Sequence, residues 1–359
     1  MPLASCPLTN ADADLENLRV PTSARDNILY AYITWAQKIV RHPTDVVFLT
    51  HIILYLLTLA PSALYLFYRF SIPHALLHWL LETYSCGPFT LMLHNHIHND
   101  GLLHRRYLWL DMLIPYTLGP LMGHTWNSYY YHHVKHHHTE NNGPEDLSST
   151  IRYQRDSLPG FLGYLCRFLF LVWIELPVYF LRRRRYNRAS KSLVSEICSI
   201  YFIFCLSRYN FHATMVTMML PLVQTRVGMM VGNWGQHAFI ERNRPTCNYR
   251  SSITLIDVQS NRHCFNDGYH TSHHQNPRRH WREHPLTFLK ARNKYQSQDA
   301  LVFQGIDFFL ITYYLLRKDY DHLVDCLVPM GNQTKLSKLE LESMLKERTR
   351  KFTAEEIPM

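Results

Sequence analysis

Two apolar stretches close together constrain this chain most, because each is long enough to cross a membrane. Residues 46–70 read VVFLTHIILYLLTLAPSALYLFYRF, and a second apolar run at 74–93 follows Pro73. A hydrocarbon core about 30 Å thick needs about 20 predominantly apolar residues. We expect these runs to form a transmembrane hairpin and the runs at 192–207 and 211–232 to form a second one.

Other apolar segments are expected to lie outside the bilayer core. Residues 160–181 could span, but Arg182–Arg185 follows them directly, and an outward crossing would place four arginines outside, against the positive-inside rule. We therefore predict an interfacial helix there. The short run at 107–122, which contains Pro115 and Pro120, is predicted to be interfacial or re-entrant. The run at 301–316 is predicted to be a buried helix of a cytosolic cap.

The composition narrows the function. The chain has 359 residues and a net charge of +9, which favours an anionic membrane surface or an acidic protein partner over nucleic acid, since no zinc-finger or helix-turn-helix pattern occurs. Its eight cysteines form no CxxC pair, so a disulfide framework and a thiolate metal site are both disfavoured. The first 20 residues carry acids and no apolar core, unlike a cleavable signal peptide.

Three short boxes of histidines follow the apolar runs. His94 and His98 are four residues apart and share one face of a helix. His133, His136 and His137 are spaced i, i+3 and i+4, and the same spacing recurs in a third box. The third box consists of His270, His273 and His274.

A single such box has ordinary explanations, which include chance, a core histidine or a metal-trapping tract. Three boxes on the same predicted side of a membrane instead indicate a polynuclear metal site at the inner face. Imidazole suits iron, zinc, copper and nickel, so spacing does not choose the metal. No Glu-x-x-His occurs in the chain, which disfavours a soluble-type carboxylate di-iron site. Oxygen activation and zinc-type hydrolysis both remain open.

In its boxes, HxxxH followed by HxxHH and a late HxxHH, the sequence resembles the membrane fatty acid desaturase and hydroxylase superfamily over about residues 46–285. The resemblance implies four transmembrane helices below a cytosolic cap with two iron ions. It also implies an Asn-x-x-x-His element after the fourth span, with the histidine as a ligand and the asparagine holding a water. Asn233 and His237 stand there.

The resemblance gives a ligand set, ambiguous only in the second box, where five of seven residues are histidine. We predict that the metal ligands are His94, His98, His133, His136, His137, His237, His270, His273 and His274, with Asn233 acting through a water. Additional candidates are His132, His138 and His96. Asp100 and Asp267 are predicted to orient ligand imidazoles, although both also fit solvated loop carboxylates.

The predicted fold is thus an all-α integral membrane protein. It has four transmembrane helices in two hairpins, interfacial helices and a cytosolic His-rich cap that holds a di-metal site. Residues 1–45 are predicted to be a cytosolic segment, 46–330 the membrane domain with its cap, and 331–359 a charged, solvated tail.

The resemblance implies O₂-dependent oxidation of an acyl lipid, with formation of a carbon–carbon double bond as the leading prediction. Electrons would come from a separate carrier, cytochrome b5 or a ferredoxin-like protein, because no His-Pro-Gly-Gly haem motif is present. In a eukaryote the location would be the endoplasmic reticulum, with the boxes on the cytosolic side. The alternatives are a lipid hydroxylase of the same fold, and a zinc-dependent membrane hydrolase or metal transporter.

Overall fold

The computed structural model describes residues 11–17, 27–353 and 355–356, and these are mainly helical. The chain divides into two compact units, which we describe separately. Unit 1 comprises Met1–Arg19, His136–Val172 and Gly228–Met359, and unit 2 comprises Val20–Lys135 and Trp173–Val227. The division predicted at residues 45 and 330 concerns membrane topology and stays a prediction.

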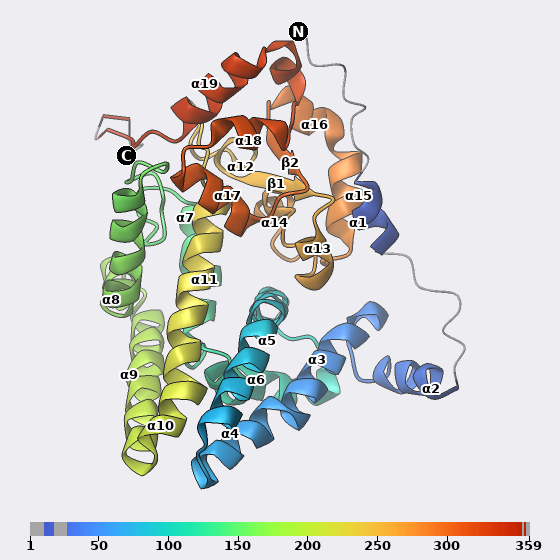
Figure 1. The fold of residues 1–359 in the computed structure, drawn as a ribbon, viewed down its shortest axis with the longest axis vertical. Helices are drawn as coiled ribbons and strands as arrows, with labels where there is room; N and C mark the ends of the chain where they lie inside the picture. Colours follow the sequence, from blue (N-terminus) through green and yellow to red (C-terminus); the bar gives the residue numbers. More distant parts are fainter. Residues whose placement is uncertain (1–10, 18–26, 354, 357–359) are drawn as a thin grey trace. The chain divides into compact units, whose positions relative to one another are not determined.

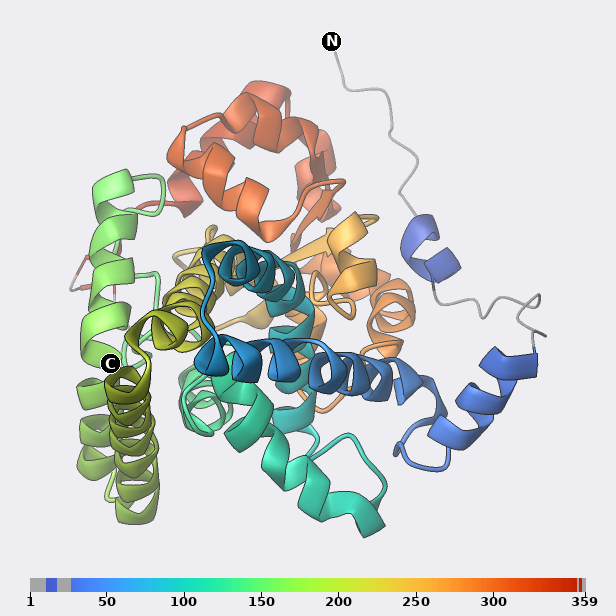
Figure 2. The same ribbon diagram turned by 60° about the horizontal axis from the view of Figure 1, so that its bottom comes forward.

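Unit 2 is built from helices (Figure 1). They are α2 (Asn27–Ala36), α3 (Val46–Leu57), α4 (Leu59–Tyr68), α5 (Ile72–His98), α6 (Leu108–Leu121), α9 (Tyr186–Tyr209), α10 (Phe211–Thr214) and the π-helix η4 (Met215–Met219), with short 3-10 turns at Pro43–Asp45 and Arg105–Tyr107. Figure 2 shows α3 and α4 as one nearly continuous rod. Three helices continue from one unit into the other: the π-helix η3 (Tyr130–His137), α8 (Leu158–Arg182) and α11 (Leu220–Gln236).

Four helical stretches of the described residues are long and apolar enough to cross a membrane, which confirms the predicted integral membrane protein and the predicted number of spans. They are Pro43–Tyr68, Leu158–Arg182, Tyr186–Tyr209 and Phe211–Gln236. One of the four predicted spans is not among these candidate spans, and another segment stands in its place. The stretch that we expected to be interfacial, at 160–181, is among the four, and the predicted span at 74–93 is not.

Helix α5 contains that missing span, and its polar side chains explain the difference. His78 and Glu82 are buried, with 1% and 0% of their surface exposed, whereas Leu77 and Tyr84 are 65% and 79% exposed. A helix with an apolar outer face and buried polar groups suits a lipid environment. An average over a sequence window does not register which face each residue occupies.

Helix α8 belongs in part to the core of unit 1. Phe161, Tyr164 and Phe168 are buried there with Trp234 of α11. The Tyr164 and Trp234 ring centroids lie 4.9 Å apart. The length and composition of α8 suit a span, while its first half is packed as part of a folded unit.

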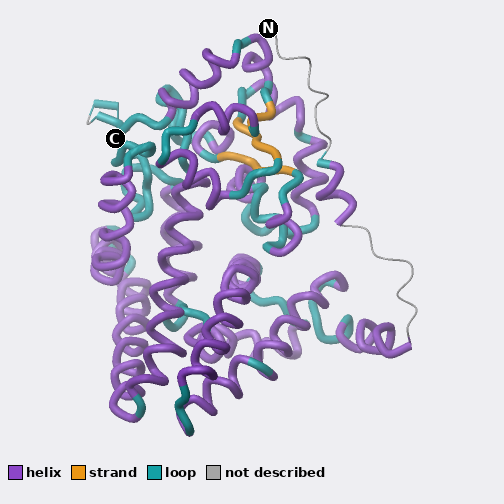
Figure 3. Tube along the Cα trace, viewed as in Figure 1, coloured by secondary structure: helices purple, strands orange, loops and turns teal. Residues whose placement is uncertain are grey.

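Unit 1 also contains a small sheet that the all-α prediction lacked (Figure 3). Strand β1 (Ile253–Ile256) pairs in parallel with β2 (Leu301–Gln304), and Ile253 lies opposite Leu301. Strand β3 (Leu327–Val328) pairs antiparallel with β2. Around the sheet lie α1 (Asp12–Asn17), α7 (His138–Glu140), α12 (Asn248–Ser251), α13 (Gln259–His263), α14 (His270–Gln275), α15 (Glu283–Lys290), α16 (Arg292–Ser297), α17 (Phe308–Leu316), α18 (Tyr320–Asp325), the 3-10 turn Gly331–Lys335 and α19 (Lys338–Arg348).

The apolar run at 301–316 is therefore not one buried helix. Gly305 has a φ of +69°, a conformation that favours glycine and ends β2. Asp307 then caps α17 by accepting a hydrogen bond from the backbone N–H of Leu310 at 2.9 Å. Turn chemistry divides the run into a strand and a helix.

The charged tail, which we expected to be solvated, packs onto unit 1. Ser337 and Glu340 form a capping box that begins α19. Leu341 and Leu345 are buried in the same core as Phe303 of β2. The apolar face of α19 is thus part of the folded unit.

Arg155 holds the end of this tail in place. Its guanidinium is fully buried and donates hydrogen bonds to five backbone carbonyls, including those of Ala238 at 3.0 Å, Arg348 at 2.9 Å and Arg350 at 2.8 Å. Burial lowers its pKa to about 9, so that the group stays charged at neutral pH. One side chain thereby joins the chain just after α11 to the end of α19.

We predict that Arg155→Met destabilises the protein by about 3 kcal/mol or more, because several buried carbonyls lose their donor. Thermal unfolding in detergent would measure this loss. Arg350→Met is the matched control: its side chain is 56% exposed and pairs with Glu347, so its loss should cost well under about 1 kcal/mol. Equal stability of the two variants would contradict the role given to Arg155.

Candidate metal centre

Four histidines converge within unit 1. His137 ends η3, His237 follows α11, and His270 and His274 lie one turn apart on α14. One nitrogen from each ring lies within 4.8 Å of the corresponding nitrogen of the other three. All four residues are buried, with at most 8% of their surface exposed.

In two of these rings the nitrogen that faces away from the group is hydrogen-bonded. This contact orients the other nitrogen of each ring toward the group. The Nδ1–H of His237 donates to the carbonyl of Ser251 at 2.7 Å, and the Nδ1–H of His137 donates to the Asp146 carboxylate at 2.7 Å. Their Nε2 atoms are then left with lone pairs. Metal-binding histidines commonly have this support on the other ring nitrogen.

The inner nitrogens approach one another closely. The Nε2 atom of His270 lies 3.2 Å from that of His237 and 2.9 Å from that of His274. Burial, and then the neighbouring His137, lowers the pKa of His237 to about 3. Burial, and then the neighbouring His270, lowers the pKa of His274 well below its usual value. Ring nitrogens that converge this closely fit a bound metal ion, because a cation accepts lone pairs from several imidazoles at once.

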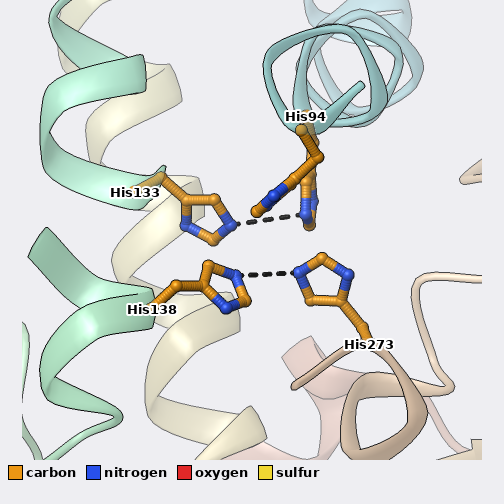
Figure 4. Close-up of side chains that lie close together, drawn as sticks. His94, His133, His138 and His273 are labelled. Carbon is orange, nitrogen blue, oxygen red and sulfur yellow. Dashed lines mark hydrogen bonds between the residues drawn. The ribbon is translucent and has the colours of Figure 1, made fainter. Parts of the chain in front are cut away.

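A second cluster, of three histidines, lies in unit 2. His94 and His98 project from the last turns of α5, and His133 comes from η3. The His94 and His133 ring centroids are 4.6 Å apart, and their Nε2 atoms are 3.3 Å apart (Figure 4). His98 lies 4.8 Å from His94 and 5.0 Å from His133, measured between ring centroids. Three imidazoles from two helices thus meet as a second set of candidate ligands.

Unit 1 holds a further histidine pair. The Nε2 atoms of His138 and His273 lie 2.9 Å apart, as the second dashed line in Figure 4 shows. The His138 ring also lies 4.8 Å from that of His274. His138, only an additional candidate from the sequence, therefore lies beside the four-histidine group.

The second box is not an α-helix, which changes its spacing rule. Residues Tyr130–His137 form a π-helix, in which hydrogen bonds run from i to i+5, and such segments are frequent at functional sites. The i, i+3, i+4 spacing that groups residues on an α-helix therefore does not apply. Nothing in the sequence marks the π-helix except the unusual number of histidines.

His136, a predicted ligand, lies outside the four-histidine group. Its Nε2 accepts a hydrogen bond from the backbone N–H of Leu147 at 2.9 Å and lies 3.6 Å from Asp146. His132 belongs to neither cluster. The Nε2–H of His96 donates to the backbone carbonyl of Asp111 at 3.0 Å, which gives it a structural role.

The structure places a carboxylate that the sequence did not predict against one of the four histidines. Asp100 is exposed on a turn with a φ of 52°. Asp267 accepts from the side chain of Gln236 at 3.2 Å, and burial raises its pKa to about 7. Asp146 is instead the acid bonded to His137, and its other oxygen accepts from the backbone N–H of Ser148. No sequence signal distinguishes it from the neighbouring Glu145.

Asn233 lies one turn before His237 on α11, and its side chain is fixed. Its amide nitrogen donates to the carbonyl of Ser148 at 2.9 Å and to the hydroxyl of Tyr164 at 2.7 Å. Its backbone carbonyl accepts from the N–H of His237 at 3.1 Å. Its predicted role in holding a water stays a prediction.

Membrane-length helices together with clustered histidines define a class of His-rich integral membrane proteins. Within that class the chain belongs to the fatty acid desaturase family, since the model described as "Fatty acid desaturase" matches residues 71–305. No curated protein and no solved structure matches the chain. Family membership implies an oxidoreductase that acts on lipids and depends on a metal.

We predict that Asp146→Asn lowers the affinity of the centre for metal by about 10- to 100-fold, because the carboxylate that holds His137 is lost. Metal content after dialysis against a graded chelator would measure the change. The control is Glu145→Gln, the same change at the neighbouring exposed position. Equal metal retention in the two variants would rule out the role of Asp146.

A second comparison separates His136 from His137. We predict that His137→Gln lowers the metal content per folded chain, whereas His136→Gln leaves it close to that of the wild type, because glutamine can still accept the Leu147 N–H. Metal analysis of the monodisperse fraction gives the answer. Loss of metal in His136→Gln alone would restore His136 as the ligand.

Proposed function

We propose that the protein is a membrane desaturase that uses O₂ to introduce a carbon–carbon double bond into an acyl lipid. The observation that carries the proposal is a buried group of four imidazoles, without any carboxylate in the group, in a chain of the fatty acid desaturase family. Imidazole ligands add no charge, so they leave a bound metal more electrophilic than carboxylates would.

The bound metal is proposed to be iron, with two ions per chain. One ion would be held by His137, His237, His270 and His274, and the other would take His94, His98 and His133 among its ligands. His138 and His273 are kept as further ligand candidates, and Asn233 as the holder of a water. Iron supplies the activation of O₂ needed to oxidise an unactivated C–H bond.

The chain's own residues prepare this chemistry. Asp146 and the Ser251 carbonyl hold ring protons on the outer side of His137 and His237, so that the inner nitrogens stay available. Burial of the histidines excludes water, which protects a strong oxidant from side reactions. The acyl chain would reach the centre from the bilayer.

The electrons are proposed to come from a separate acidic carrier, cytochrome b5 or a ferredoxin-like protein, at the cytosolic face of the endoplasmic reticulum. Arg105, Arg106 and Arg278 are exposed basic residues suited to steer it. The Arg279 guanidinium instead donates a hydrogen bond to the backbone carbonyl of Ser272, a residue of the third histidine box, at 2.9 Å. Arg182–Arg185 is assigned to lipid headgroups.

Expression in a host that lacks its own desaturase, followed by lipid profiling by mass spectrometry, tests the function. We expect an acyl product two hydrogens lighter, and two iron ions per purified chain. A main product that gains oxygen would make the protein a hydroxylase. Zinc with activity that needs no O₂ would overturn oxidation altogether.

We predict that His94→Ala, His137→Ala and His274→Ala each abolish product formation and lower the iron content. His263→Ala is the control, because this exposed histidine of α13 belongs to neither cluster. Full activity in any of the three variants would refute that ligand.

A further inference from the structure

Helix α5 carries a polar stripe that the metal centre only partly uses. Every fourth residue along the helix is polar or ionisable, and residues four apart lie on one helix face. The stripe consists of His74, His78, Glu82, Cys86, Thr90, His94 and His98. The last two are candidate metal ligands, and the five before them run back along a helix of 27 residues, a rise of about 40 Å.

The residues of the stripe nearest the start of α5 are joined through a residue of α4. The hydroxyl of Ser62 lies 2.8 Å from the Nε2 of His74 and 2.9 Å from the Nδ1 of His78. One hydroxyl therefore bridges two rings that are one turn apart. A hydroxyl and an imidazole can each accept one proton while donating another.

The next links run along α11. The Glu82 carboxylate accepts from the amide of Gln224 at 3.3 Å. The Cys86 thiol lies 3.0 Å from the hydroxyl of Thr225 and also has Gln224 and Thr90 as hydrogen-bond partners. Glu82, Cys86 and Thr90 are thus joined through two neighbouring residues of α11.

From Thr90, one hydrogen bond and then two ring contacts lead toward the three-histidine cluster. The hydroxyl of Thr90 lies 3.1 Å from the Nε2 of His124. The His124 ring is 5.3 Å from that of Tyr129, which in turn lies 5.2 Å from the His133 ring, measured between centroids. All of these residues belong to unit 2.

Buried polar atoms without a hydrogen-bond partner distinguish the stripe from ordinary packing between membrane helices. Glu82 Oε1 and His78 Nε2 are buried and have no hydrogen-bond partner among the described residues. Polar side chains that join membrane helices do so by hydrogen bonds across the helices, and a buried polar group left without a partner destabilises the fold. An ionisable group kept at that cost inside a membrane points to a function.

We propose that the first five residues of this stripe, His74 to Thr90, carry protons along α5 toward the metal centre. The inference rests on the proposed desaturation, in which R–CH₂–CH₂–R′, O₂, two electrons and two protons give R–CH=CH–R′ and two waters. The electron carrier supplies the electrons, but the protons must enter a buried centre, where His94 and His98 are 8% and 4% exposed. Each proton passes by being accepted on one side of a group and released on the other. The source is the aqueous side at the Ile72 end of α5.

The test uses iron-loaded protein in lipid vesicles, oriented with the His98 end of α5 outward and a pH-sensitive dye trapped inside. With lipid substrate and reduced carrier outside, the wild type should make the interior alkaline in proportion to product. Glu82→Gln should keep its iron and slow product formation by about a hundredfold or more. Glu175→Gln, the same change on α8 and outside the stripe, should behave like the wild type.

A second readout needs no turnover. In iron-free protein, the infrared difference between wild type and Glu82→Gln over a pH titration should show the Glu82 carboxyl converting to carboxylate. A carboxyl that never changes its protonation would overturn the proposal. So would product formation with no change of internal pH, or a Glu82→Gln variant as fast as the wild type. If the wild type forms no oxidised lipid, the desaturation itself fails, which is a distinguishable result.

Discussion

Ring nitrogens of buried imidazoles repel one another when their lone pairs converge, unless a cation lies among them. That constraint applies in unit 1, where four buried histidine rings meet. The chain supports the arrangement from outside with the Asp146 carboxylate and the Ser251 carbonyl, which fix the ring protons away from the centre. The π-helix at Tyr130–His137 and the turn of α14 then bring ligands from distant parts of the sequence to one point.

The sequence predicted the candidate metal ligands best where histidines recur at regular spacing. The three boxes and the Asn-x-x-x-His element predicted His137, His237, His270 and His274, and the structure brings these four together. The sequence did not predict which histidines converge where the local backbone conformation decides it. The choice between His136 and His138 depends on a π-helix, whose register no spacing rule for α-helices can give. Asp146 looks like its acidic neighbours in the sequence, and only the fold sets it apart.

The membrane-spanning helices were likewise predicted only in part. Runs of apolar residues gave the number of candidate spans correctly, because the thickness of a bilayer fixes their length. The candidate spans differ from the predicted ones at α5 and α8. Helix α5 turns its polar groups inward, which lowers its average hydropathy, and α8 is apolar along a length that also packs partly into a folded unit. The small sheet was missed as well, because its strands are four residues or shorter and lie next to helix-forming segments.

The guanidinium of Arg155 has a consequence for what can disturb the four-histidine group. It joins the carbonyl of Ala238, next to His237, to the carbonyls of Arg348 and Arg350 near the end of the sequence. A change that loosens the end of α19 therefore also disturbs the backbone next to His237. Damage more than a hundred residues further along the chain can thus reach the four-histidine group without touching any histidine.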